Sequence, residues 1–336
     1  MIKNQSGYVY RKAFLIMSIS FIAMLVFVVV IYTFKQGTAE EDQKALITEQ
    51  PQVILPLVNE ENMVKSVQYA ELQSQIVGCL SGKQGDYSIG FCELSNPHYL
   101  LINSKKMPSA SVIKLFIMIH AFKEYSNQTL SLDRLLVVQE DDKVGGTGSL
   151  ANKPSGTKVS IRELIELMIT ESDNTATNML IEKLGFEPIN ATIKDLSCTD
   201  TVLQRKMMDF SSAKEGKENY TSVADLVAIL YKIANNQCLG PPYDENMVSI
   251  LTQQKQRNMI PEGVPPKYTV ANKCGALPGV VNDVAIVFSE DGGYILCVLS
   301  NNVPERDAQS TIVEISKAAF DYYDMVLKGF SLTENI

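Results

Sequence analysis

Strand-like segments lie at both ends of the part of this chain that is expected to fold, and helix-like segments lie between them. Short apolar or alternating runs bounded by turn residues predict five strands. These runs are residues 86–94, 98–102, 268–276, 280–288 and 294–300. The last three are separated by Leu277-Pro278-Gly279 and by a Gly-Gly turn, which predicts an antiparallel meander. We therefore expect the first and last segments to form one antiparallel five-stranded sheet.

The middle of the chain is predicted to be helical. Residues 112–122 are apolar on every side apart from Lys114 and His120, so this helix should be buried. Other helices are predicted at residues 61–80, 161–168, 175–184, 221–235, 245–253 and 304–326. Strands, then helices, then strands and a closing helix is an α+β order. The central helices are expected to form an inserted all-helical lobe, with a cleft between the lobe and the sheet.

Residues 13–34 form an uncharged apolar run ahead of the folded part. A helix of that length covers roughly 33 Å, enough to cross a hydrocarbon core of about 30 Å. Basic residues precede the run and acidic residues follow it, so the positive-inside rule places the N-terminus in the cytoplasm. A cleaved signal peptide, cut near Gly37 or Ala39, is the alternative. Either way the folded part lies outside the cytoplasm.

The anchor interpretation divides the chain into four parts. They are a cytoplasmic N-terminus (1–12), a transmembrane anchor (13–34), an acidic linker (35–60) and a folded domain (61–331). The protein is then expected to be a single-pass protein of the cell membrane, with its folded domain extracytoplasmic.

Charge and cysteine content narrow the possible partners. The formal net charge is −8, which argues against a nucleic-acid partner, because phosphate binding needs clustered Lys and Arg. Six cysteines and two histidines are present, but none of the cysteines form a CxxC pair, so a zinc site is not expected. We expect no metal and no other cofactor, and the pairing of the cysteines stays open.

Ser111 and Lys114 are candidates for a nucleophile and its base. They lie three residues apart at the start of the helix 112–122, so their side chains share one face. The first turn of a helix offers free N–H groups that favour a developing anion. Desolvation in this apolar stretch would lower the pKa of the lysine and let it act as a base. The same spacing occurs in polar stretches at residues 155–158 and 211–214, and a lysine with its charge at the surface is the structural alternative.

Two further motifs contain polar side chains that could belong to an active site. Ser172-Asp173-Asn174 lies between two predicted helices and could face a cleft, although the same residues are favoured as plain helix caps. Lys273-Cys274-Gly275 lies on the strand predicted at the edge of the meander, where the glycine would let a ligand approach the backbone. Neither motif is specific by itself.

Together and in this order, the three motifs resemble the Ser-x-x-Lys, Ser-Asp-Asn and Lys-Thr-Gly set of class A β-lactamases and related penicillin-binding proteins. The steps of 61 and 101 residues between them are similar to those of class A enzymes. The likeness covers roughly residues 61–331. It implies a β-lactamase/transpeptidase-like fold and a serine hydrolase that takes small β-lactam or peptidoglycan-peptide substrates.

The resemblance also implies a role for each residue. Ser111 would attack the carbonyl and become acylated, and Lys114 would help to deprotonate it. Ser172 would pass a proton to the leaving nitrogen. The implied substrate contacts are Lys273, Cys274 and Gly275 around the substrate carboxylate, Asn174 on its amide side chain, and the backbone N–H groups of Ser111 and Ala276 as an oxyanion hole.

Two positions depart from the class A pattern. Cys274 stands where the family has Thr or Ser, and a thiol is a weaker hydrogen-bond donor. Met207 stands in Arg205-Lys206-Met207-Met208-Asp209, at the place of the glutamate that serves deacylation in class A. We therefore expect a β-lactam hydrolase with slow deacylation. The alternatives are a D-alanyl peptidase or esterase with the same acylation step, and a β-lactam-binding sensor that does not turn over.

Overall fold

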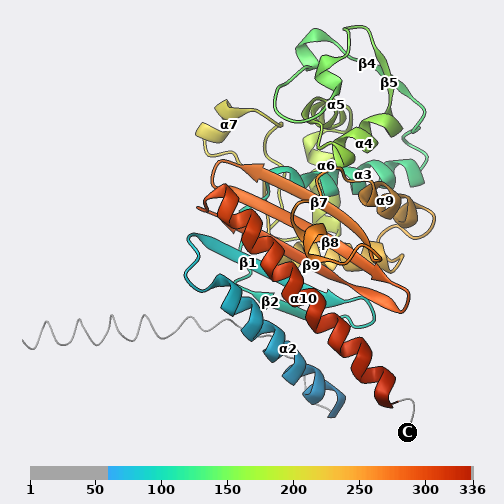
Figure 1. Ribbon diagram of the computed structural model, residues 1–336. Helices are drawn as coiled ribbons and strands as arrows, with labels where there is room; N and C mark the ends of the chain where they lie inside the picture. Colours follow the sequence, from blue (N-terminus) through green and yellow to red (C-terminus); the bar gives the residue numbers. More distant parts are fainter. Residues whose placement is uncertain (1–59, 334–336) are drawn as a thin grey trace, which may run out of the picture. The chain divides into compact units, whose positions relative to one another are not determined.

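The computed structural model describes residues 60–333, and its centre is one antiparallel sheet of five strands (Figure 1). The strand order is β2-β1-β9-β8-β7, so strands from the two ends of the folded part lie side by side. The strands are β1 (Asp86–Glu93), β2 (Tyr99–Ile102), β7 (Thr269–Leu277), β8 (Val280–Ser289) and β9 (Gly292–Asn301). The predicted α+β class and antiparallel sheet are confirmed. β7 lies at the edge of the sheet, as predicted.

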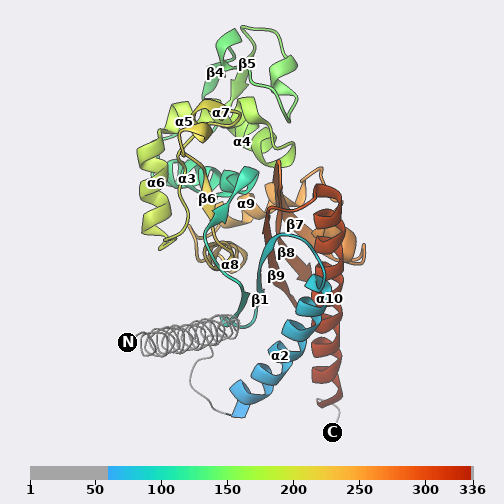
Figure 2. The same cartoon turned by 90° about the vertical axis from the view of Figure 1, so that its left-hand side faces the viewer.

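Two helices, α2 (Glu60–Leu80) and α10 (Glu305–Thr333), cover one face of the sheet (Figure 2). Aromatic side chains from these helices and from the strands form the core on this side. Phe91 stacks on Tyr294 with ring centroids 5.4 Å apart, and it meets Tyr322 of α10 edge-on at 5.5 Å. Leu72 and Ile76 of α2 are completely buried against the same cluster.

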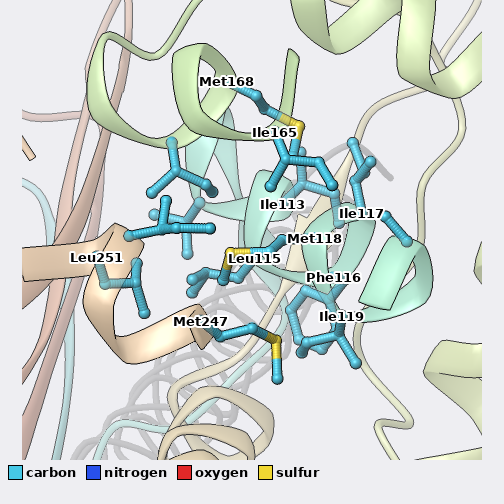
Figure 3. Packing of buried hydrophobic residues seen from close by; sticks show 14 of the residues in the cluster. Ile113, Leu115, Phe116, Ile117, Met118, Ile119, Ile165, Met168, Met247 and Leu251 are labelled. Carbon is cyan, nitrogen blue, oxygen red and sulfur yellow. The ribbon is translucent and has the colours of Figure 1, made fainter. Parts of the chain in front are cut away.

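The other face carries α8 and the helical lobe. The helices on this side are α3 (Lys114–Ser126), α4 (Ile161–Thr170), α5 (Asn174–Leu184), α6 (Phe186–Asp195), α8 (Val223–Ala234) and α9 (Tyr243–Thr252). α3 lies at the centre of the lobe, where Ile165 and Met168 of α4 and Met247 and Leu251 of α9 surround its side chains (Figure 3). Its residues 114–122 are all buried, which confirms the prediction from its apolar sequence.

Short elements complete the described part. They are β3 (Met107–Pro108), β4 (Leu135–Val137), β5 (Lys158–Ser160), β6 (Tyr220–Thr221), α7 (Phe210–Lys214) and four 3₁₀ turns at Ala110–Ile113, Glu140–Asp142, Leu150–Asn152 and Ile260–Gly263. β3 pairs with β6 and β4 pairs with β5. These small pairs and α6 had no clear sequence signal, and the β4–β5 pair corrects the prediction that the inserted lobe is all-helical.

Several predicted helix ends are confirmed by their capping contacts. The Ser160 side chain accepts a hydrogen bond from the Glu163 N–H at the start of α4. Gly185 ends α5 with φ at +86°, a conformation that glycine adopts without a steric penalty.

Among residues 60–333, no helix is both long and apolar enough to span a membrane. The predicted anchor at 13–34, and all but the last residue of the linker predicted at 35–60, lie outside the described residues.

Packing of α8 on β1 gives a prediction for stability. A Cβ added at Gly90 of β1 would lie 2.5 Å from Val227 Cγ2 and 3.3 Å from the Val223 carbonyl oxygen, both in α8. Gly90→Ala should therefore overpack this contact at a cost of about 1–3 kcal/mol, and lower the melting temperature by roughly 2–10 °C. Gly78→Ala on α2 is the matched control, because a Cβ added at Gly78 meets nothing within 4 Å. Thermal unfolding followed by circular dichroism measures both. An equal effect of the two substitutions would contradict close packing at Gly90.

Candidate active site

Ser111 lies in a 3₁₀ turn, Ala110–Ile113, directly ahead of α3. The sequence predicted that Ser111 lies in the first turn of the α-helix; in the structure it lies in the 3₁₀ turn just before that helix. Ala110, just before it, has φ at +46°, which is unusual for a residue with a Cβ. Ser111 lines a cavity of about 180 Å³ between the Ser172 loop, β7 and the segment around Met207.

β7 and β8 pack against the turn that carries Ser111. A Cβ at Gly275 would lie only 2.6 Å from the Ser111 backbone nitrogen and 3.0 Å from that of Val112. The sequence suggested that Gly275 makes room for a ligand; Gly275 lines the cavity, and its lack of a Cβ also makes room for the Ser111 backbone. The Asn282 side-chain amide of β8 donates to the backbone oxygens of Pro108 and Ser109 at 3.0 and 3.2 Å.

Lys114 is completely buried, and its ammonium group has an acceptor for each of its protons. It donates to the Ser172 backbone oxygen at 2.6 Å, to Ser172 Oγ at 3.1 Å and to Asn174 Oδ1 at 3.0 Å. Burial, followed by the nearby positive charge of Lys273, lowers the pKa of Lys114 well below its usual value. A lysine in this state loses its proton more readily, as a base requires.

Ser172 lies between α4 and α5 with φ at +54° and is nearly buried. Its hydroxyl oxygen accepts from Lys114 and also from Lys273 Nζ, at 3.0 Å. Both lone pairs of the hydroxyl are then engaged, so its own proton is left to donate elsewhere. Ser172 lines the cavity, which is where a proton acceptor on a ligand would lie.

The two residues after Ser172 have different roles: Asp173 caps a helix and Asn174 lines the cavity. Asp173 is the N-cap of α5: its carboxylate accepts from the Ala176 N–H at 2.8 Å and from the Leu150 N–H at 2.7 Å. Asn174 lines the cavity, and its amide nitrogen donates to the Gly145 backbone oxygen at 3.1 Å. The motif therefore serves as a helix cap and also reaches the cavity.

Lys273 and Cys274 form the β7 side of the site. Lys273 is completely buried, and it donates to the Cys274 backbone oxygen at 2.7 Å as well as to Ser172. Burial lowers the pKa of Lys273. The Cys274 thiol lies 2.7 Å from Gln256 Oε1, and burial raises the pKa of the thiol, so it stays protonated and donates.

A loop closed by Arg205 and Glu218 covers the opposite side. The Arg205 guanidinium donates to both carboxylate oxygens of Glu218, at 3.0 and 2.9 Å. Asn178 of α5 holds Met207 by its backbone: it accepts from the Met207 N–H at 2.8 Å and donates to the Met207 carbonyl at 3.1 Å. Met207 and Met208 both line the cavity.

No carboxylate is among the described residues that line this cavity. Asp209, the nearest acidic residue in sequence to Met207, caps α7 through hydrogen bonds to Ser212, and Glu218 is paired with Arg205. The carboxylates that could act as a deacylation base are therefore either hydrogen-bonded elsewhere or absent from the described lining of the cavity.

The remaining candidates lie away from the cavity. His120 is a buried residue of α3, as predicted, and its Nδ1 lies 2.8 Å from Thr192 Oγ1. All six cysteines are free thiols, and residues 60–333 contain no cluster of His, Cys, Asp and Glu that could hold a metal ion.

Four residues of the site carried no usable sequence signal: Thr147, Asn178, Asn219 and Gln256. They are polar residues in loops or on a helix, with spacing that matches no motif. Asn178 lies four residues after Asn174 on α5, so the two share one helical face. That shared face was the one sequence clue that Asn178 lies near the site.

The family model described as "Beta-lactamase enzyme family" matches residues 71–323. The chain belongs to this β-lactamase family. A β-lactamase of Proteus vulgaris is 26% identical over 234 residues, which cover 68% of this chain and 84% of that protein. The family assignment agrees with the three motifs around the cavity, and the protein is a serine β-lactamase-type hydrolase.

Solved structures of this family share the fold. The β-lactamase of Sphaerobacter thermophilus superposes with a TM-score of 0.71 at 24% identity, covering 76% of this chain and 97% of that one. A mutant of PBP-A, solved as an acyl-enzyme complex with penicillin G, superposes with a TM-score of 0.70 at 25% identity, covering 76% and 97%.

The burial of Lys114 gives a prediction for its titration. Burial and the charge of Lys273 both favour the neutral amine, so Lys114 should lose its proton at a pH well below the usual lysine value of about 10.4. Lys273→Gln removes the neighbouring charge and should move the titration midpoint to higher pH. Lys255→Gln, at an exposed lysine paired with Glu171, is the matched control and should not move it. NMR of ¹³C-labelled lysine side chains measures the midpoint. A midpoint near the usual value, or one that Lys273→Gln lowers, would contradict the interpretation.

Proposed function

We propose that this protein opens β-lactam amides by acylation of Ser111 and releases the acyl group slowly. The observation that carries the proposal is the Ser172 hydroxyl, which two buried lysines hold at the wall of the Ser111 cavity. A polar group held in this way can deliver its own proton into the cavity without first having to reorient.

The proposed acylation step uses these groups in turn, although the hydrogen bonds of Lys114 in this structure are to Ser172 and Asn174 and not to Ser111. Ser111 Oγ attacks the lactam carbonyl carbon as its proton passes to Lys114, taken as the neutral amine. The backbone N–H groups of Ser111 and Ala276 are proposed to stabilise the oxyanion. The C–N bond then breaks, Ser172 gives its proton to the nitrogen, and the proton on Lys114 restores the Ser172 hydroxyl. Asn174 is proposed to bind the amide side chain of the substrate, and Cys274 and Gly275 the opposite end. Lys273, which the resemblance placed on the substrate carboxylate, is buried and does not line the cavity, so its proposed role is to hold Ser172.

Deacylation by water needs a base beside the ester, and none of the described residues that line the cavity is a carboxylate. Met207 lines the cavity, and a thioether cannot take a proton from water. General-base catalysis contributes about 10²–10⁴ in rate, so its loss should leave a long-lived acyl-enzyme. The similarity to a PBP-A mutant solved as a penicillin G acyl-enzyme supports the acylation step of the proposal.

Kinetics with a chromogenic cephalosporin test the proposal. The expected result is a burst close to one product per enzyme, followed by a steady rate that is slower by about 10²–10⁴. Mass spectrometry should place the adduct on the peptide that contains Ser111. Met207→Glu should raise the steady rate, because Asn178 holds the backbone of residue 207 and not its side chain.

The controls separate the nucleophile from the other serine–lysine pairs. Ser111→Ala should abolish labelling, whereas Ser155→Ala should leave it intact, because Ser155 is an exposed residue bonded to Glu140. Rapid multiple turnover by the unmodified protein would sink the slow-deacylation proposal.

A D-alanyl peptidase or esterase remains the second candidate. The same acylation groups would serve it, and the lack of a base for water equally favours an acceptor other than water. Product analysis with a D-alanyl-D-alanine peptide, in the presence and absence of an amine acceptor, distinguishes this activity from β-lactam opening.

We also propose that residues 13–34 anchor the enzyme in the cell membrane, with residues 61–331 outside. The uncharged run and the basic residues ahead of it support this topology. Protease added to spheroplasts should remove the catalytic domain and leave an N-terminal epitope tag protected. Recovery of a soluble protein starting near Glu40 would show instead that the run is a cleaved signal.

A further inference from the structure

Among the described residues that line the cavity, none offers an unpaired cation to a ligand. The one charged residue among them is Arg205, which already pairs with both carboxylate oxygens of Glu218. Lys114 and Lys273 are completely buried behind the wall, where both donate to Ser172 and Lys273 also donates to the Cys274 backbone oxygen. An anionic group of a ligand would therefore not meet a free positive charge at the surface of the cavity.

Gln256 presents an unused donor at the same end of the cavity. Gln256 is an exposed residue, and its Oε1 accepts from the Cys274 thiol at 2.7 Å, which favours the orientation with the amide oxygen on the thiol. Its Nε2 makes no hydrogen bond with the described residues and is left to donate. The backbone of Gln256 is held on both sides: its N–H donates to Gln254 Oε1 at 3.1 Å, and its carbonyl accepts from Asn272 Nδ2 at 3.4 Å.

We propose that Gln256 is a specificity-determining residue, whose amide Nε2 donates a hydrogen bond to the ligand group lying beside Cys274. Because this donor is neutral, the subsite accepts a neutral carbonyl, such as an ester or amide, nearly as well as a carboxylate. The thiol acts as a positioning group that turns the amide nitrogen toward the ligand. This inference rests on the proposed acylation of Ser111.

The test compares penicillin G with its methyl ester. For each compound, the second-order rate constant for acylation of Ser111 is measured by intact-protein mass spectrometry in the full-length protein. The unmodified protein should acylate with the two compounds at rates within about tenfold of each other, because a neutral hydrogen bond is worth a factor of that order. The ratio of the two rates cancels any difference in the amount of folded protein.

Substitution of Gln256 should change that ratio in a defined direction. Gln256→Glu keeps an acceptor for the Cys274 thiol but opposes a carboxylate with a like charge, so the rate with penicillin G should fall about tenfold more than the rate with the ester. Gln256→Ala removes the donor and should lower both rates by about 3–10-fold. The matched control is Gln253→Glu, the same charge change at an exposed residue at the end of α9 outside this cavity.

Three outcomes would overturn the proposal, and they separate it from the proposed function. Acylation of Ser111 with an unchanged ratio in Gln256→Glu removes the role of Gln256 and leaves the acylation proposal standing. A preference of more than about 100-fold for penicillin G over the ester in the unmodified protein contradicts a neutral subsite. Failure of both compounds to acylate the unmodified protein overturns the proposed function, and the role of Gln256 with it.

Discussion

Two buried lysines share one hydroxyl, and much of the described structure is arranged to make this possible. Lys114 comes from the helical lobe and Lys273 from the edge strand of the sheet, so Ser172 joins the two halves of the domain. Burying a lysine as a cation without water typically costs several kcal/mol. The apolar surroundings of α3 and the sheet therefore favour the neutral amine, and the lowered pKa of both lysines is the result.

Some backbone strain lies at the same place. Three of the eight described non-glycine residues with positive φ line the cavity, namely Ala110, Ser172 and Met208. Such conformations cost of order 1–3 kcal/mol each and persist only where surrounding contacts enforce them. Here those contacts are visible: Asn282 holds the segment before Ser111, and Asn178 holds Met207, next to Met208. The site therefore depends on amide side chains that do no chemistry themselves.

The sequence predicted the elements of this fold well where one physical signal dominated. The burial of residues 114–122 of α3 followed from an apolar run that only Lys114 and His120 interrupt, and the edge position of β7 followed from the meander. The signal was weak wherever tertiary contacts decide the structure. β3 and β6 are two residues each, and their pairing across more than a hundred residues leaves no local pattern. Gly275 was identified, but its neighbour, the Ser111 backbone, could not be read from the strand alone.

The contacts of Met207 have a consequence for substitution at this position. Asn178 hydrogen-bonds only the main chain of residue 207, so these two bonds do not depend on the side chain that stands there. The Met207 side chain itself is buried in the hydrophobic cluster that contains α3, so a carboxylate here would give up apolar burial. A change of side chain at residue 207 therefore costs stability through packing and leaves the backbone hydrogen bonds of the loop in place.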